Sequence, residues 1–191
     1  MKLYYSPTSP YARKARIVIL ECGQSVELQA ENVIDHPDSV PNPLNKVPCL
    51  VLDDGSTLFD SPVICGYLLA QVGRADESTD WTARRLEAMG DGIMDAAFSL
   101  VMETKRPEAQ QSDFWKARWQ AAILGALDEL ETTLPEFSGQ FGLGEVSLAA
   151  ALGYLDFRLG HMAWRENRPR LESWFATVAE RSSVKETRPP D

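Results

Sequence analysis

Residues 47–73, VPCLVLDDGSTLFDSPVICGYLLAQVG, decide the fold of the first half of the chain. Two apolar runs meet at Asp54-Gly55, a pair of turn residues that favours a β-hairpin. Ser61-Pro62 then fits the start of a helix, because serine is a good N-cap and proline needs no backbone donor in the first turn. A glycine follows the helical run as a typical stop. The stretch therefore predicts strand, turn, strand and helix in that order.

The residues before this stretch predict two further strands around a helix. Lys2–Tyr5 is a short apolar run, Pro10–Cys22 has helical periodicity, and Val26–Val33 alternates apolar and polar side chains. A helical crossover allows its flanking strands to pair in parallel, whereas the hairpin makes an antiparallel pair. The order β-α-β-β-β-α therefore predicts an α/β domain over residues 1–73, with a mixed four-stranded sheet and helices packed on it.

After residue 73 the pattern becomes helical. Residues 74–80 are polar and acidic, and they predict a linker. No later stretch has a convincing strand pattern, so residues 81–191 are predicted to form an all-helical bundle domain. The segments with helical apolar stripes are 81–103, 112–134, 147–159 and 170–181.

Two glycines interrupt the first predicted helix of this second domain. Inside a helix, Gly90 and Gly92 each cost about 1 kcal/mol relative to alanine. Glycines in such positions indicate either close packing against a neighbouring element or a kink.

Charge and composition exclude several classes of partner. The 191-residue chain carries a net charge of −9, which argues against nucleic acid or an anionic membrane as the main partner. No apolar run approaches the roughly 18 residues of a membrane helix, and the first residues lack the apolar core of a secretory signal. We therefore expect a cytoplasmic protein.

The cysteines and histidines form no recognisable metal motif. Cys22, Cys49 and Cys65 show neither a C-x-x-C pair nor another metal-binding spacing. The two histidines, His36 and His161, are far apart in the sequence. We expect buried free thiols in a reducing compartment, and no bound metal.

The first predicted helix begins with a turn that is rich in hydroxyl groups. Residues 4–14 read YYSPTSPYARK, in which Ser9-Pro10 fits the N-cap and the first helical position. The positive end of the helix favours an anion, to which the Ser9 hydroxyl can donate, and Arg13 would add positive potential. Capping alone also explains Ser9, so both interpretations stay open.

Two further motifs carry possible chemistry. A cis Val47-Pro48 bond would turn the Val47 N–H and C=O outward to pair with an extended peptide, whereas a trans bond is an ordinary strand start. At the next helix, Asp60 can bind an ammonium, and Ser61 with the helix N-terminus can bind a carboxylate. The two charges suit an α-amino-acid head group, although a capped helix with a solvated aspartate is the simpler alternative.

The order and spacing of these motifs resemble those of the cytosolic glutathione transferase family. The segments SPYARKARI, NPLNKVPCLVLDDG and LFDSPVICGYL carry the resemblance, which extends over essentially the whole chain. In detail the chain is similar to bacterial transferase-like proteins whose first turn reads S-P-[FY]-x-R-K. The resemblance implies a thioredoxin-like N-terminal domain, a helical C-terminal domain, glutathione as co-substrate without a metal, and a homodimer.

The resemblance also implies where glutathione would bind. The Val47 backbone, before a cis Pro48, would pair with the cysteinyl residue of glutathione. Asp60 and Ser61 would hold the γ-glutamyl head group, and Lys46 would contact the glycyl end.

Ser9 is the best match to the first-turn hydroxyl of the family, because it immediately precedes the helical proline. The resemblance implies that this hydroxyl hydrogen-bonds the glutathione sulfur and favours its thiolate, which is the nucleophile. Ser9 would then act electrostatically and would form no covalent bond. The sequence leaves three rivals to the Ser9 hydroxyl, those of Tyr5, Ser6 and Thr8.

His36 is, with Lys46, a further candidate for contact with the glycyl end of glutathione.

Two departures from the family pattern stand out. The family usually has a capping box, [ST]-x-x-D, at its central buried helix; the match here is Ser147 to Ala150, with alanine in place of aspartate. Glu145 just upstream is a candidate substitute. The first turn also lacks the cysteine that relatives use for thiol–disulfide chemistry.

The sequence therefore predicts a glutathione transferase that activates the glutathione thiolate for attack on a small hydrophobic electrophile. One alternative is a non-catalytic glutathione-binding or regulatory protein with the same fold. The other is a glutathione-dependent peroxidase or isomerase.

Overall fold

The computed structural model describes residues 1–134 and 141–190, and the chain forms two compact units. Unit 1 consists of Met1–Arg84 and the C-terminal segment that begins at Ser182, and unit 2 consists of Arg85–Arg181. These units differ from the predicted division into residues 1–73 and 81–191. The main difference is that the end of the chain packs with the N-terminal part.

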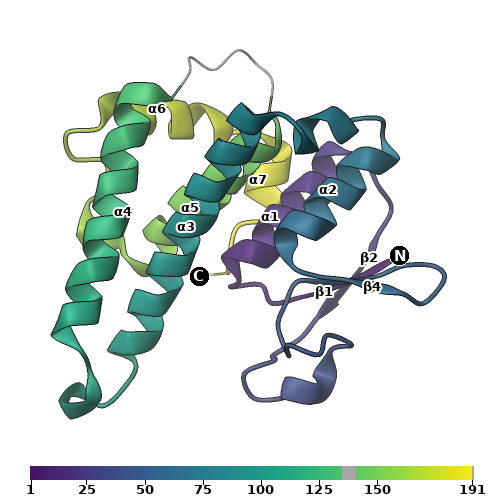
Figure 1. The fold of residues 1–191 in the computed structure, drawn as a ribbon, viewed down its shortest axis with the longest axis horizontal. Coiled ribbons are helices and arrows are strands. Elements are labelled where there is room, and N and C mark those ends of the chain that lie inside the picture. The colour runs from purple at the N-terminus through teal and green to yellow at the C-terminus, as the bar shows by residue number, and fades with distance from the viewer. Residues whose placement is uncertain (135–140, 191) are drawn as a thin grey trace. The chain divides into compact units, whose positions relative to one another are not determined.

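Unit 1 contains the predicted mixed sheet of four strands (Figure 1). β1 pairs in parallel with β2 and antiparallel with β3, and β3 pairs antiparallel with β4. The crossover helix and the hairpin produce these two directions. In the sheet order β2-β1-β3-β4, the strands are β1 (Lys2–Tyr5), β2 (Glu27–Ala30), β3 (Cys49–Val51) and β4 (Thr57–Leu58).

Two helices, α1 (Pro10–Glu21) and α2 (Ser61–Gln71), lie side by side on the sheet (Figure 1). Two short 3-10 helices complete this part: η1 (Pro37–Ser39), before β3, and η2 (Ala75–Ser78), which contacts α2. The residues predicted as a linker therefore contain a short helix packed on unit 1. The fully buried core of this unit includes Leu3, Ile17, Leu50, Ile64 and Leu68.

The C-terminal helix α7 (Ser182–Glu186) packs against α1. The guanidinium of the buried Arg13 donates to the Val184 carbonyl oxygen at 3.1 Å and to the Thr187 hydroxyl at 3.5 Å. The positive charge of Arg13 is thus held at the C-terminal segment. Its predicted contribution of positive potential beside Ser9 stays a prediction.

Unit 2 is helical in its described residues, as the sequence predicts. α3 and α4 run antiparallel, and the turn at residues 105–112 joins them (Figure 1). Most residues in the first three turns of α5 are buried, so this apolar helix forms the centre of the unit. The helices are α3 (Trp81–Thr104), α4 (Asp113–Thr133), α5 (Leu143–Arg158) and α6 (Pro169–Val178), with the 3-10 helices η3 (Glu108–Gln110) and η4 (Gly160–Met162).

The start of α5 corrects the predicted capping box. Gly142 is the N-cap, and its N–H donates to a carboxylate oxygen of Glu145 at 3.2 Å. Glu145 therefore supplies one half of a capping box, as the candidate substitute. Ser147 lies inside the helix, and its hydroxyl donates to Asp91 at 2.7 Å. The predicted box from Ser147 to Ala150 therefore lies inside the helix and not at its start. The motif requires a serine or threonine at the N-cap, and this helix has Gly142 there.

Gly90 marks a close approach between α3 and α5. A β-carbon at Gly90 would lie 2.6 Å from Ser147 Oγ, 2.7 Å from the Ser147 carbonyl carbon and 2.9 Å from Leu148 N. Apart from the adjacent residues and the nearby backbone of its own helix, a β-carbon at Gly92 would meet no atom of the described residues within 4 Å. Close packing therefore accounts for Gly90, and nothing in the structure explains Gly92.

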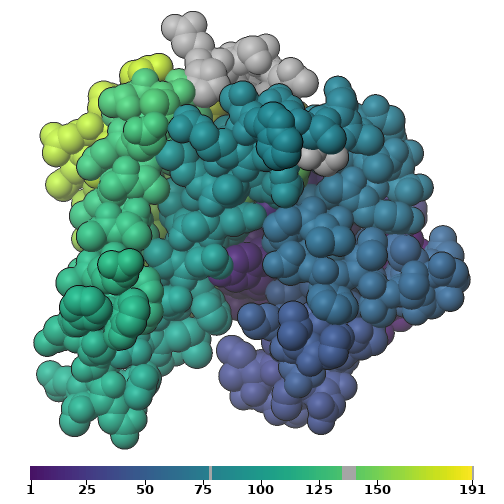
Figure 2. Space-filling view, viewed as in Figure 1, coloured from purple at the N-terminus to yellow at the C-terminus, as the bar shows by residue number. Residues whose placement is uncertain are grey.

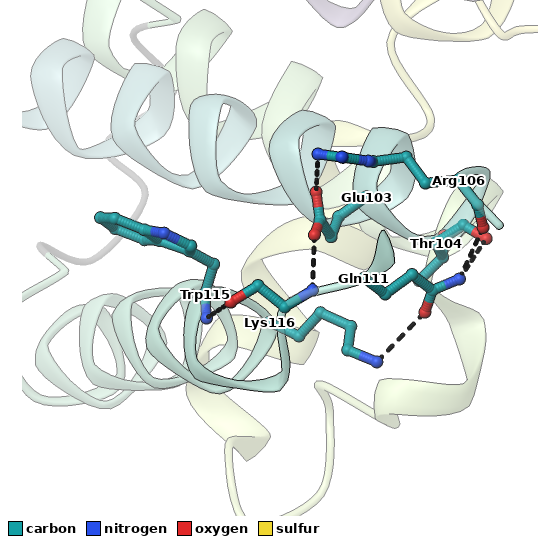
Figure 3. A network of polar contacts seen from close by, with 7 residues as sticks. Glu103, Thr104, Arg106, Gln111, Trp115 and Lys116 are labelled. Carbon is teal, nitrogen blue, oxygen red and sulfur yellow. Dashed lines mark hydrogen bonds and ion pairs between the residues drawn. The ribbon is translucent and has the colours of Figure 1, made fainter. Parts of the chain in front are cut away.

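A polar network holds the turn between α3 and α4 (Figure 3). Glu103, which is largely buried, accepts the Ser112 N–H at 2.7 Å and lies 3.5 Å from Arg106 Nη1. The Gln111 side-chain amide donates to the Thr104 and Arg106 carbonyl oxygens at 3.2 and 2.9 Å. Because Ser112 is the N-cap of α4, the network fixes the point at which the second helix begins.

Candidate functional site

The sheet topology brings the three predicted motifs to one end of unit 1. β1 runs toward this end and is followed by Ser9 at the start of α1. β3 is antiparallel to β1, so its beginning, and Val47-Pro48 before it, lie at the same end. β4 is antiparallel to β3 and leads back to this end, where Asp60-Ser61 begins α2. Three segments that are far apart in the sequence thus form one candidate site.

Ser9 is the N-cap of α1, as predicted. The Ala12 N–H donates to Ser9 Oγ at 3.2 Å, and Pro10 takes the first helical position. The rival hydroxyls of Ser6 and Thr8 hydrogen-bond each other at 3.3 Å. A serine hydroxyl has one donor and two acceptor positions, so capping leaves the Ser9 hydrogen available. Capping uses an acceptor position of this hydroxyl, so the predicted donation to an anion would use a different part of it.

The other predicted contact residues have different surroundings. The Tyr5 ring is half-buried under the Arg16 guanidinium, which lies 4.8 Å from the ring centroid. Burial lowers the pKa of Arg16, and the Coulomb interaction with Tyr5 opposes this shift.

His36 and Lys46, the two candidates for the glycyl end, are exposed. Figure 2 shows the segment around η1, which His36 precedes, at the surface of unit 1.

A buried asparagine orders the segment before β3. Asn42 Nδ2 donates to the Lys46 carbonyl oxygen at 2.8 Å, and Asn42 Oδ1 accepts the Leu44 N–H at 3.0 Å. The Val47-Pro48 peptide bond that follows is cis, the less common of the two alternatives. Sequence reasoning missed Asn42. The signal that could have found it is its place before a proline, which is typical of turns.

The start of α2 differs by one residue from the prediction. Asp60 is the N-cap, Ser61 is the first helical residue and Pro62 the second, whereas the sequence predicted Ser61 as the N-cap. Proline fits either position, because the first N–H groups of a helix lack partners within it. The Asp60 side chain is exposed and makes no capping hydrogen bond, and Ser61 is almost fully buried. The Phe59-Asp60 peptide bond is cis.

The three cysteines are not among the predicted contact residues. Cys22, Cys49 and Cys65 are free thiols, and the last two are buried. Burial raises the pKa of the Cys22 and Cys49 thiols, which favours their protonated forms. In residues 1–134 and 141–190, no group of three or more potential metal ligands lies together. In the same residues, no helix has the length and apolar character needed to cross a membrane.

Comparison with known proteins assigns the chain to a family. Residues 3–76 match the N-terminal domain of glutathione S-transferases, and residues 113–177 match the C-terminal domain. The chain is 38% identical to the GST-like protein YibF of Escherichia coli (strain K12), over 100% of this chain and 99% of that protein. The chain belongs to the glutathione S-transferase family.

Two solved bacterial structures extend this result. A glutathione transferase family member from Pseudomonas fluorescens Pf-5, with bound S-(propanoic acid)-glutathione, has 38% identity and a TM-score of 0.90 over 100% of both chains. A glutathione S-transferase from Methylobacillus flagellatus KT, with glutathione bound, has 35% identity and a TM-score of 0.92 over 99% of each chain. The predicted fold, a thioredoxin-like α/β part followed by a helical part, is confirmed. The glutathione contacts of individual residues stay predictions.

Proposed function

We propose that this transferase-family protein binds glutathione at the end of the sheet in unit 1 and activates its thiol for attack on a hydrophobic electrophile. The observation that carries the proposal is the convergence there of Ser9, the Val47 backbone and the Asp60-Ser61 pair. Glutathione offers a matching group to each: a thiol, an extended peptide backbone and an amino-acid head group. The glutathione and glutathione conjugate in the two similar structures support this assignment.

The peptide part of glutathione would bind through backbone and charge. Within the described residues, the Val47 N–H donates no hydrogen bond, so it is available to the cysteinyl carbonyl. The exposed Asp60 carboxylate would bind the γ-glutamyl ammonium, and Ser61 with the N-terminus of α2 would bind the carboxylate. The exposed Lys46 would pair with the glycyl carboxylate.

Ser9 would activate the thiol. A free thiol has a pKa of about 8.5 and is mostly protonated at neutral pH, whereas the thiolate is the nucleophile. The Ser9 O–H, which capping leaves available, would donate to the sulfur at the positive end of α1. Both interactions stabilise the anion, and they do not require a bond between Ser9 and the substrate.

The test separates the donor role of Ser9 from its capping role. Ser9→Gly removes the hydroxyl but keeps an N-cap that is only a few tenths of a kcal/mol weaker, and Ser9→Thr keeps the hydroxyl. We expect Ser9→Gly to lower kcat/KM for conjugation of a chloronitroaromatic substrate by about 10²–10³-fold, as loss of an oxyanion donor does elsewhere. The thiolate absorbance of bound glutathione should fall in parallel, and Ser9→Thr should retain both signals.

Other results would redirect the assignment. If Ser9→Gly changes neither rate nor thiolate absorbance, Ser9 is not the activating group. Calorimetry that detects no glutathione binding at millimolar ligand would contradict the whole proposal. Binding without turnover on a panel of electrophiles and peroxides would identify a binding or regulatory protein.

We also propose that the protein is a cytoplasmic homodimer, on the basis of its resemblance to the family. Light scattering coupled to size-exclusion chromatography tests the assembly. A mass of one chain at micromolar concentration would contradict it.

A further inference from the structure

We propose that Asn42 is a positioning residue for glutathione binding. Asn42 holds the peptide group between Lys46 and Val47 and thereby orients the Val47 N–H toward glutathione. The inference rests on the proposed function, because it concerns the backbone donor that the proposal assigns to the cysteinyl residue. Asn42 itself would not touch glutathione.

Asn42 binds the backbone of three successive residues. Its side chain is 3% exposed. Nδ2 donates to the Lys46 carbonyl oxygen at 2.8 Å, and Oδ1 accepts the Leu44 N–H at 3.0 Å. The Asn42 carbonyl oxygen accepts the Asn45 N–H at 2.8 Å. One residue therefore clamps the whole segment that leads to Val47.

The bond to Lys46 controls the direction of the Val47 N–H. The Lys46 carbonyl and the Val47 N–H belong to one planar peptide group, in which C=O and N–H point in opposite directions. Asn42 Nδ2 fixes the carbonyl oxygen, which lies in this plane on one side of the C–N bond. The N–H is thereby fixed on the other side, where no acceptor of the described residues binds it.

Little else restrains this segment. The side chains of residues 43–46 are all exposed, and Leu44 is 60% exposed, so burial of apolar surface does not hold them. Asn45 has a φ of 51°, in the left-handed region that asparagine tolerates better than most residues. Without the clamp, the Val47 N–H would sample several directions. Glutathione affinity would then fall in proportion to the population that points correctly.

The experiment uses two variants and one matched control in the full-length protein. Asn42→Ala removes both side-chain hydrogen bonds. Asn42→Asp keeps the size and the acceptor for Leu44 N–H, but it replaces the donor to Lys46 with an oxygen. The control is Asp54→Ala, which removes a similar bond, from the Ser56 N–H at 2.9 Å, in the turn beyond the other end of β3.

Three measurements follow: amide hydrogen exchange without ligand, calorimetry with glutathione, and steady-state kinetics. For both Asn42 variants we expect faster exchange at the hydrogen-bonded amides of Leu44 and Asn45, with unchanged exchange at the core amide of Leu3. We expect the Kd of glutathione to rise roughly tenfold for Asn42→Ala, which loses two hydrogen bonds of modest net strength, and to rise also for Asn42→Asp, which loses the bond to the Lys46 carbonyl oxygen. KM for glutathione should rise while kcat at saturating glutathione changes by less than about twofold, and Asp54→Ala should match the wild type.

The outcomes separate this inference from the proposed function. Unchanged exchange at the amides of Leu44 and Asn45 in both Asn42 variants would overturn the clamp, whether or not glutathione binding changes. Faster exchange with an unchanged Kd would overturn the positioning role, although the wild type binds. If the wild type itself fails to bind glutathione, the proposed function is wrong and the positioning role is overturned with it. If Asn42→Ala does not fold, Asn42→Asp decides by the same criteria.

Discussion

The close approach at Gly90 allows a matched pair of substitutions with opposite expected effects. Gly90→Ala places a methyl group against α5, at 2.6 Å from Ser147 Oγ and under 3 Å from two backbone atoms. Gly92→Ala, two residues along the same helix, places the same methyl group where no described atom lies within 4 Å, apart from the adjacent residues and the nearby backbone of its own helix. Both changes have the same intrinsic effect on the helix, so their difference isolates the packing at Gly90.

The magnitude follows from three contributions. Overpacking costs typically about 1–3 kcal/mol, and the upper end applies here because backbone atoms cannot rotate away. A shift of Ser147 would also lengthen its 2.7 Å hydrogen bond to Asp91, a contact with a charged acceptor worth about 1.5–3 kcal/mol. Alanine regains about 1 kcal/mol of helix propensity. We expect Gly90→Ala to lower the free energy of unfolding by about 3.5–5 kcal/mol in total, and Gly92→Ala to raise it by about 1 kcal/mol.

Urea denaturation followed by far-ultraviolet circular dichroism measures both variants on the same scale. The midpoint should move to lower urea for Gly90→Ala and to higher urea for Gly92→Ala. The double variant Gly90→Ala/Ser147→Ala should stay destabilised, because the backbone contacts remain after the hydroxyl is removed. A Gly90→Ala protein as stable as the wild type would refute the close approach of α3 and α5. Equal losses in both single variants would instead point to a general intolerance of this helix.

Two further predictions concern unit 1. Arg13→Met should lower the free energy of unfolding by about 1.5–3 kcal/mol, because it leaves the buried Val184 carbonyl oxygen without its charged donor. Arg16→Met removes an exposed 3.4 Å contact to the Glu186 carbonyl oxygen and the packing of the guanidinium 4.8 Å from the Tyr5 ring centroid. It should cost less than Arg13→Met, and equal losses by urea denaturation would contradict this interpretation. Burial raises the pKa of Cys49, so its stabilising contribution is present below the unfolded pKa of about 8.5 and is lost as the pH rises toward the native value. Between pH 8 and 9.5 the free energy of unfolding of the wild type should therefore fall more steeply with pH than that of Cys49→Ala. The difference in slope should reach up to about 1.4 kcal/mol per pH unit. Parallel plots of unfolding free energy against pH would show that the Cys49 thiol does not contribute.

Some features of the candidate site follow from local chemistry and others do not. Ser9 before Pro10 predicts the N-cap of α1 because capping depends only on neighbouring residues. The start of α2 is displaced by one residue, since Pro62 fits both of the first two helical positions. Asn42 escaped prediction because its role depends on the path of the next four residues, which the sequence does not specify.

The sequence by itself determined the element order, the mixed sheet, the helical second half and the family. These features depend on periodicity, turn residues and caps, which act over a few neighbouring residues, and on the spacing of motifs along the chain. The sequence also brings Ser9, Val47 and Asp60 to one end of the sheet, because strand directions follow from the connections.

Only the tertiary structure decided which distant segments touch. Arg13 binds the C-terminal segment more than 170 residues away, and Gly90 meets Ser147 on another helix. Both contacts depend on how helices pack, which leaves no periodic signal in either partner alone. Ser9 shows the same division. Its position at the N-cap follows from the sequence, whereas only the structure shows that its oxygen accepts the Ala12 N–H, which leaves the hydroxyl donor available.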